Sequence, residues 1–148
     1  MTGRPRPATS GKAEEVTSSL PPMTETPSVA TLKAILDAFN AHDLDRIMSF
    51  FSDECVLEMP RGLDPWGTRY AGLDAVREGL RARLKGIPDV QYTDDTHFVA
   101  GNVGISQWTL RGTSVGGERV EVKGCDFFTF KGGKIVKKDS YWKIREGF

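Results

Sequence analysis

Asp126 is the residue of this sequence whose type and surroundings point most directly to chemistry. It lies in GCDFFTF, residues 124–130, a run that otherwise has the composition of a buried strand. Taking a carboxylate out of water is costly unless a partner compensates it, and apolar surroundings disfavour the ionised form. A protonated carboxyl can donate a hydrogen bond to a developing oxyanion. We therefore expect Asp126 to act as a general acid or oxyanion donor.

Two structural alternatives for Asp126 stay open from the sequence. A neighbouring Ser, Trp or Lys side chain could satisfy the carboxyl group without any ligand. If Lys138 of the next apolar run also points inward, it would pair with Asp126 and favour the ionised carboxylate, against the donor role. The question is whether Asp126 faces an open cavity or Lys138.

The two histidines and the adjacent aspartates of the chain are more typical of structural roles than of a catalytic or metal site. His42 stands next to Asp43 at the end of a predicted helix, and His97 lies in a strand-like run. Asp94 and Asp95 are adjacent, and adjacent strand residues face opposite ways. We therefore expect a solvated edge or a bulge there, not an acid pair or a metal site.

Long strands in the second half of the chain must position Asp126. Turns at Gly101-Asn102, Gly116-Gly117 and Gly132-Gly133 separate four strand-like runs, which cover residues 89–100, 103–113, 119–130 and 134–144. Side chains alternate along a strand. One face of the third run therefore carries Val122, Gly124, Asp126, Phe128 and Phe130, and the other carries Cys125, Phe127 and Thr129. Both faces are largely apolar, which favours a sheet covered on both sides.

Helices are predicted before these strands. Ser28 is a candidate N-cap for a first helix, residues 44–51 predict a short second one, and residues 73–84 predict a third with one apolar face. Between them, CVLEMP predicts a strand that ends at Pro60, and the Gly- and Pro-containing residues 61–72 predict a loop. Helices first and strands later indicate an α+β fold with the helices on one face of the sheet.

Three segments, taken together and in this order, carry a resemblance to a known superfamily. They are FNAHDLDRIMSFFSDECVLEMPRG, YAGLDAVREGL and CDFFTFKGGKIVKKDSYW. The chain from Ser28 to Arg145 resembles the nuclear transport factor 2-like (NTF2-like) superfamily, which includes ketosteroid isomerases, scytalone dehydratases and SnoaL-like polyketide cyclases. The resemblance implies a cone-shaped α+β domain, with about three N-terminal helices packed in a strongly curved, mixed and mostly antiparallel sheet.

The resemblance also implies a pocket inside the cone and a homodimer through the outer sheet face. Asp126 would point into the pocket, where it looks like the acid that ketosteroid isomerases use as an oxyanion donor. The expected substrate-binding residues around it are Trp108, Phe128, Trp142, Met59, Ser106 and Ser140. Trp66 and Tyr70 are large for a solvated loop. They would either close the pocket or pack on the protein itself.

The sequence departs from the isomerase pattern at two places. Ile35 stands where those enzymes have a second oxyanion donor, a tyrosine. Met59 stands where they have the catalytic base, an aspartate before the proline that ends the first strand. Glu58, one residue earlier, is the remaining candidate base, but it faces away from Met59 in a regular strand and needs a bulge to turn inward.

Composition restricts the function further. The chain has 148 residues, 39% hydrophobic and 27% charged, with a formal net charge of zero. Charges are scattered, so neither nucleic acid nor a membrane is expected as a partner. Cys55 and Cys125 lie in apolar contexts typical of buried thiols, which favours a reducing, cytoplasmic location. No nucleotide fingerprint or Cys/His cluster is present, so neither a cofactor nor a metal is implied.

Two classes of function remain. One is a cofactor-independent isomerase, cyclase or dehydratase for a hydrophobic carbonyl or polycyclic substrate, with Asp126 as acid and water or Glu58 as base. The other is a ligand-binding or dimerising module without chemistry.

The first residues have a different composition from the rest. Residues 1–27 are rich in Pro, Ser, Thr and Gly and poor in large apolar side chains, so we expect a disordered tail before a domain at residues 28–148. Met23 precedes the first helix closely enough to be an alternative start to Met1.

Overall fold

The computed structural model describes residues 26–146, which form three helices and one six-stranded sheet. The helices are α1 (Val29–Asn40), α2 (Leu44–Ser49) and α3 (Leu73–Gly86). The strands are β2 (Phe51–Asp64), β3 (Gly67–Ala71), β4 (Gln91–Ala100), β5 (Val103–Thr113), β6 (Arg119–Lys131) and β7 (Lys134–Trp142). The tail expected at residues 1–27 lies almost entirely outside the described residues.

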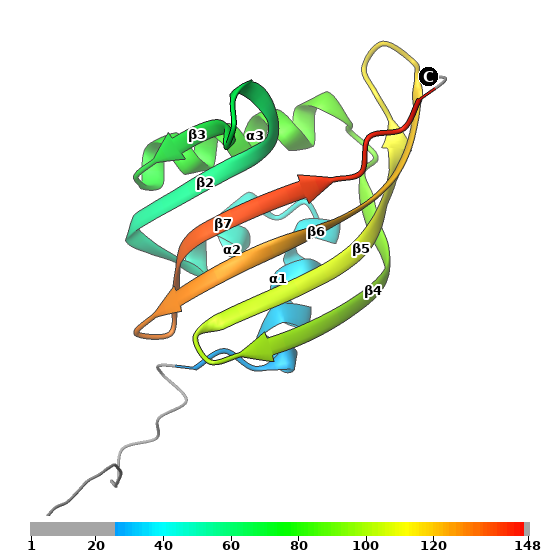
Figure 1. Ribbon diagram of the computed structural model, residues 1–148. Helices are drawn as coiled ribbons and strands as arrows, with labels where there is room; N and C mark the ends of the chain where they lie inside the picture. The colour runs from blue at the N-terminus through cyan, green and yellow to red at the C-terminus, as the bar shows by residue number, and fades with distance from the viewer. Residues whose placement is uncertain (1–25, 147–148) are drawn as a thin grey trace, which may run out of the picture.

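The sheet is mixed, with the strand order β3-β2-β7-β6-β5-β4. Strands β2 and β7 run parallel, and every other neighbouring pair is antiparallel. Figure 1 shows the sheet curving around the helices, which lie on one side of it. The predicted α+β fold is confirmed. The strand that carries Asp126, β6, has β5 on one side and β7 on the other.

Helix α1 lies against the sheet and buries Leu32, Ile35, Leu36, Ala38 and Phe39. Ser28 is its N-cap, and its side-chain oxygen accepts a hydrogen bond from the Thr31 amide at 3.0 Å. Leu32 is fully buried over Gly104 of β5, where an added Cβ would come 2.6 Å from a Leu32 methyl group. Glycine at this position therefore lets the helix and the sheet approach closely.

The predicted loop at residues 61–72 is wrong, because the chain forms a hairpin there. Strand β2 continues past Pro60 to Asp64, and β3 pairs with it, with a register irregularity between Met59 and Asp64. A proline is tolerated where the ladder is irregular. Gly67 makes the close approach feasible, since its φ is +81° and an added Cβ would lie 1.9 Å from the Met59 carbonyl oxygen.

The predicted bulge at Asp94 and Asp95 is confirmed on edge strand β4. The register with β5 shifts between Thr93 and Thr96, and Asp94 has a φ of +54°. Of the two alternatives, a solvated edge or a bulge, the bulge is present, and it leaves Asp95 mostly buried. Its side chain is 19% exposed and bound by Lys33 at 3.0 Å, because the bulge turns it toward α1.

Both cysteines are free thiols, but they differ in burial. Cys55 is buried, as expected, whereas Cys125 is half-buried on the outer face of the sheet. Among residues 26–146, no helix combines the length and the apolar character needed to cross a membrane.

Candidate functional site

Asp126 and Lys138 form a buried ion pair on the concave face of the sheet. The Lys138 ammonium donates to Asp126 Oδ1 at 3.0 Å, and the two residues are only 5% and 3% exposed. Asp126 lies on β6 opposite Ser140 of β7, so alternation directs the Lys138 side chain to the same face. Between an open cavity and Lys138, the structure places Asp126 against Lys138.

Two further donors complete the hydrogen bonding of Asp126. The Ser140 hydroxyl donates to Oδ1, and the Trp108 indole N–H donates to Oδ2 at 3.0 Å. Lys138 also donates to the Ser140 oxygen at 2.8 Å. Both carboxylate oxygens are thus occupied by protein donors. We call Asp126, Lys138, Ser140 and Trp108 the polar cluster.

Aromatic rings surround the polar cluster. The Lys138 ammonium lies 5.2 Å from the ring centre of Phe39 and 5.9 Å from that of Phe128, which is 2% exposed. Trp108 fits beside Gly124, where an added Cβ would lie 2.7 Å from the indole ring. The ring of Tyr92 meets Trp108 edge to face at 4.9 Å. Two charges are therefore held in a largely apolar interior.

The polar cluster lines an interior cavity of only about 10 Å³, the space of roughly one water molecule. Met59, Pro60, Ser140 and Trp142 line this inner cavity and also an outer cavity of about 300 Å³. The inner cavity is therefore filled by the protein's own side chains. A substrate would reach the cluster only if a side chain between the two cavities moved, and Trp142 lies at that boundary.

Two arginines contact the ring of Trp142. The guanidinium carbon of Arg83 lies 4.5 Å from a Trp142 ring centre and that of Arg61 lies 5.5 Å from it. Arg83 also lines the inner cavity. Burial lowers the pKa of the Arg83 guanidinium, and the nearby charge of Arg61 acts in the same direction.

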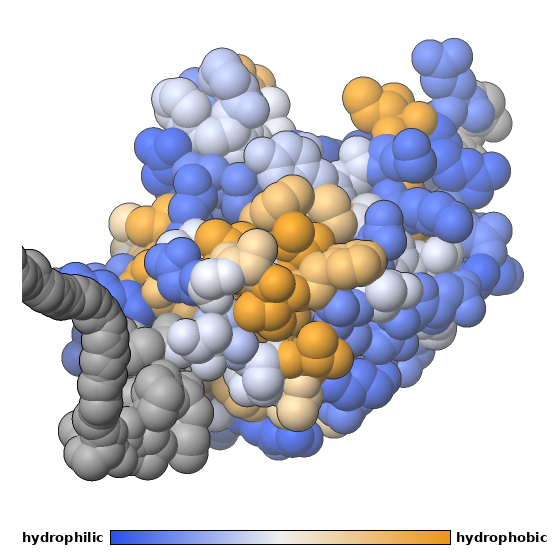
Figure 2. Space-filling model, turned by 60° about the horizontal axis from the view of Figure 1, so that its bottom comes forward, coloured by the Kyte–Doolittle hydropathy of each residue, from blue (hydrophilic) through white to orange (hydrophobic). Residues whose placement is uncertain are grey.

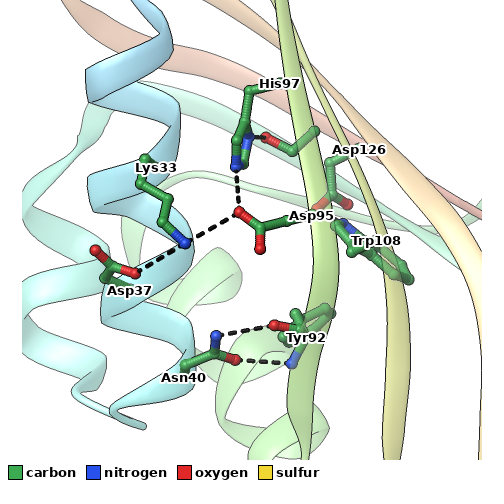
Figure 3. Close-up of polar contacts among 9 residues, drawn as sticks. Lys33, Asp37, Asn40, Tyr92, Asp95, His97, Trp108 and Asp126 are labelled. Carbon is green, nitrogen blue, oxygen red and sulfur yellow. Dashed lines mark hydrogen bonds and ion pairs between the residues drawn. The ribbon is translucent and has the colours of Figure 1, made fainter.

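Tyr92 contributes a phenol group to the same cavity and is 6% exposed. Burial raises the pKa of Tyr92; the Arg83 charge opposes this rise and the Asp126 charge adds to it. The Asn40 side chain fixes this residue against α1: its Nδ2 donates to the Tyr92 carbonyl oxygen at 3.0 Å, and its Oδ1 accepts from the Tyr92 amide at 2.8 Å (Figure 3). The phenol therefore remains neutral and able to donate.

Glu58 does not join the polar cluster. It pairs with Asp139 in the register of β2 and β7, so it shares the face opposite Ser140. Its carboxylate is held by Arg69 at 2.7 Å and Lys137 at 3.3 Å. Burial would raise the pKa of Glu58, but the hydrogen bonds from Arg69 and Lys137 and their charges bring it below its ordinary value.

The other predicted binding residues do not all lie at one site. Met59 and Trp142 line both cavities, whereas Trp66 lines the outer cavity and lies under the guanidinium of Arg69. Tyr70 lines neither of these cavities in the described part of the chain. It packs against Gly79 of α3, where an added Cβ would lie 2.9 Å from the Tyr70 ring.

Ser106 is also outside the inner cavity and belongs to a chain of polar contacts with His97 and Asp95. His97 lies between Ser106 and Asp95, with 2.8 Å between its Nδ1 and the Ser106 oxygen and 2.8 Å between its Nε2 and the Asp95 carboxylate. Although these are the residue types of a nucleophilic triad, Ser106 is only 2% exposed. This arrangement suits the structural role expected for His97. His42 likewise bonds the Val90 carbonyl oxygen at 2.7 Å.

Sequence reasoning missed Arg83, Tyr92 and Asp139. Arg83 follows Val76 and Leu80 on the buried stripe of α3, so a charged residue at an apolar position was the available signal. Asp139 lines the outer cavity, where burial and the nearby Glu58 charge raise its pKa and a hydrogen bond from Tyr141 opposes that. Within residues 26–146, no three His, Cys, Asp or Glu side chains come together to hold a metal ion.

Comparisons with known proteins identify the fold. A sequence model described as SnoaL-like domain matches residues 32–138. An NTF2-like protein of unknown function from Burkholderia pseudomallei K96243 is similar, with 22% identity, a TM-score of 0.69, and coverage of 77% of this chain and 88% of that chain.

Two further solved structures agree with this fold. A candidate polyketide cyclase from Xanthomonas campestris pv. campestris has 20% identity, a TM-score of 0.67, and coverage of 76% of this chain and 87% of that chain. A candidate isomerase from Bacillus subtilis has 18% identity, a TM-score of 0.64, and coverage of 77% and 84%. The predicted resemblance to the NTF2-like superfamily is confirmed, and at these identities the structures show the fold alone.

The buried ion pair predicts strongly non-additive mutational effects. Lys138→Met should lower the free energy of unfolding by about 3–5 kcal/mol, because it leaves the Asp126 charge buried without its counter-ion. The double variant Asp126→Leu/Lys138→Met should recover most of that loss, since an apolar pair of similar volume needs no charge compensation. Urea denaturation of both single variants and the double variant measures this. Losses that simply add would contradict a coupled pair.

Glu58 predicts a pH dependence of stability. Its pKa in the folded protein lies below the ordinary value of 4.5. Its contribution is therefore fully present above about pH 4.5 and is lost as the pH falls through the lower, folded-state pKa. Glu58→Gln should flatten the acid limb of stability against pH, measured by urea denaturation between about pH 3 and 6. Glu54→Gln, at an exposed site on the same strand, is the control, and an equal flattening there would refute the assignment.

Proposed function

The chain belongs to the SnoaL-like domain family, and from that premise we propose that it is a cofactor-independent isomerase, cyclase or dehydratase for a hydrophobic carbonyl or polycyclic substrate. The observation that carries this proposal is the ion pair of Asp126 and Lys138, buried beside an apolar cavity. The descriptions of two structural neighbours as a candidate cyclase and a candidate isomerase support it.

The free-energy cost of burying the polar cluster indicates that these residues have a function beyond stability. Replacing a buried ion pair by well-packed apolar residues is often neutral or stabilising by about 1–4 kcal/mol. A domain that needed only stability would therefore gain little from charges at Asp126 and Lys138. Desolvated charges beside a cavity are typical of sites that bind or transform a ligand.

The geometry favours other roles for Asp126 and Lys138 than the sequence suggests. Both oxygens of Asp126 already accept hydrogen bonds, so the donor to a substrate carbonyl is Lys138, whose ammonium would stabilise the oxygen of an enolate. Asp126, 3.0 Å from that ammonium, is then the nearest carboxylate, and its Oδ2, which accepts only the Trp108 N–H, has a lone pair left for the proton that leaves the substrate carbon. Returning this proton to another carbon completes an isomerisation. Glu58 is held on the opposite face by Arg69 and Lys137 and takes no part in this scheme.

A non-catalytic, ligand-binding or dimerising role is the second candidate. It is favoured by the inner cavity of about 10 Å³ and by the protein hydrogen bonds that both Asp126 oxygens already accept. The two candidates differ in whether a bound carbonyl compound exchanges its α-protons, the first step that isomerisation and cyclisation share.

The outer sheet face supports the proposal of a homodimer. Phe98, Phe127 and Tyr141 are 50%, 40% and 54% exposed, and the rings of Phe127 and Tyr141 lie 5.6 Å apart. Phe98, Ile105 and Phe127 are neighbours across β4, β5 and β6. Figure 2 shows hydrophobic residues gathered near the centre of that view. An exposed apolar patch of this kind marks an interface, and we assign it to a second copy of the chain in the cytoplasm.

The catalytic proposal predicts that Lys138 controls proton exchange. Deuterium incorporation at the α-carbon of cyclic ketones, followed by NMR in D₂O, should fall about 10²–10³-fold in Lys138→Met, the loss typical of a missing oxyanion donor. Lys137→Met is the matched control, since this neighbouring lysine faces the other side and bonds Glu58. Exchange that survives in Lys138→Met would reject the catalytic role, and ketone binding without exchange in the wild type would favour the second candidate.

The dimer proposal predicts a monomer when a charge enters the outer patch. Phe127→Glu should dissociate the dimer while leaving the circular dichroism unchanged, because this side chain is on the face away from the core. Light scattering coupled to size-exclusion chromatography measures the mass. Val115→Glu, at a 77% exposed site beyond β5, is the control. A monomeric wild type, or a Phe127→Glu variant that stays dimeric, would contradict the proposed interface.

A further inference from the structure

Arg83 is a half-buried cation in the lining of the inner cavity, and the polar cluster does not explain its presence there. It lies on α3, on the stripe that also buries Val76 and Leu80, and lines the cavity together with Lys138 and Asp126. The lining of the inner cavity therefore contains two basic side chains and one carboxylate. Arg61 lines neither cavity but lies 5.5 Å from the same Trp142 ring, so it adds another positive charge nearby.

No carboxylate pairs with Arg83 within residues 26–146. The other arginines on or near the same helix do have such partners: Arg69 bonds Glu58, Arg77 bonds Asp45 and Arg81 bonds Glu78. The direct contact of Arg83 is the face of Trp142, and the Asp126 carboxylate is already occupied by three donors. Its guanidinium thus brings five N–H donors to the cavity with no anionic acceptor.

Tyr92 presents a second unused donor to the same cavity. The residue is 6% exposed, and its hydroxyl forms no hydrogen bond with any residue between 26 and 146. A buried hydroxyl without a partner is costly, as is a desolvated guanidinium. Oxygen acceptors are what both groups lack, and an anionic oxygen group would satisfy both and offset the excess positive charge.

We propose that Arg83, assisted by Tyr92 and Arg61, binds an anionic oxygen group of the substrate, a carboxylate or an ionised enol or phenol. This inference rests on the proposed function, in which the inner cavity is the substrate site. The substrate is then a hydrophobic anion. Its charged group lies at the Trp142 end of the cavity, and its reacting carbonyl lies at Lys138. Because Arg83 stacks on Trp142 at the boundary of the two cavities, binding exchanges this stack for an ion pair with the ligand.

The test compares an anionic and a neutral probe with the same ring system, 2-naphthoate and its methyl ester, on the full chain. Tryptophan fluorescence titration should give at least about tenfold tighter binding of naphthoate by the wild type, as expected for a charge-assisted, bidentate contact. Arg83→Met should abolish this preference and change ester binding less than about twofold. Arg81→Met is the matched control, because Arg81 is paired with Glu78 and is absent from the cavity lining.

The conservative variant and the exchange assay separate the possible failures. Arg83→Lys keeps the charge, so it should keep part of the preference and shows that loss of fold does not explain the result. A preference for naphthoate that depends on Arg83 supports the anion site even if no ketone exchanges its protons, in which case only catalysis fails. Equal binding of the two probes, no binding of naphthoate, or an unchanged preference in Arg83→Met would each overturn the inference.

Discussion

The ion pair between Asp126 and Lys138 is the interaction around which the interior of this domain is arranged. Two buried charges are tolerated only when hydrogen bonds satisfy what remains of each group. Trp108 and Ser140 supply those bonds, and Gly124 leaves the space that the Trp108 ring occupies. The parallel pairing of β2 with β7 places the carboxylates of Glu58 and Asp139 on the outer face of the sheet, away from the polar cluster.

Much of the fold could be predicted because local signals agree with one another. The N-cap at Ser28, the apolar stripes of the helices and the glycine-containing turns all indicate the observed elements. The hairpin of β2 and β3 could not be predicted, since Pro60, Pro65 and the three glycines of residues 61–72 are typical of a loop. There, a non-local fit decided the structure: Gly67 and the irregular register allow β3 to pair with β2.

For the site, strand alternation predicts which face of the sheet a side chain lies on, but not which side chains meet there. Alternation assigns Asp126 to the concave face, but the partner of Asp126 depends on the register between β6 and β7, which the sequence leaves open. Arg83 and Tyr92 come from a helix and an edge strand far from Asp126 in the chain, so only the folded structure brings them together. Ser106, expected in the pocket, instead bonds His97, because the bulge at Asp94 and Asp95 directs Asp95 and His97 toward α1.

The proposed catalysis depends on a contact between the Lys138 ammonium and the substrate oxygen. A crystal structure with a phenol that mimics the enolate of a cyclic ketone is the most direct measurement. We expect the phenol oxygen within about 3 Å of Lys138 Nζ, with Asp126 still bound to Lys138 and with Trp142 displaced from Arg83. A ligand confined to the outer cavity, with the inner cavity still filled and no contact to Lys138, would contradict the account.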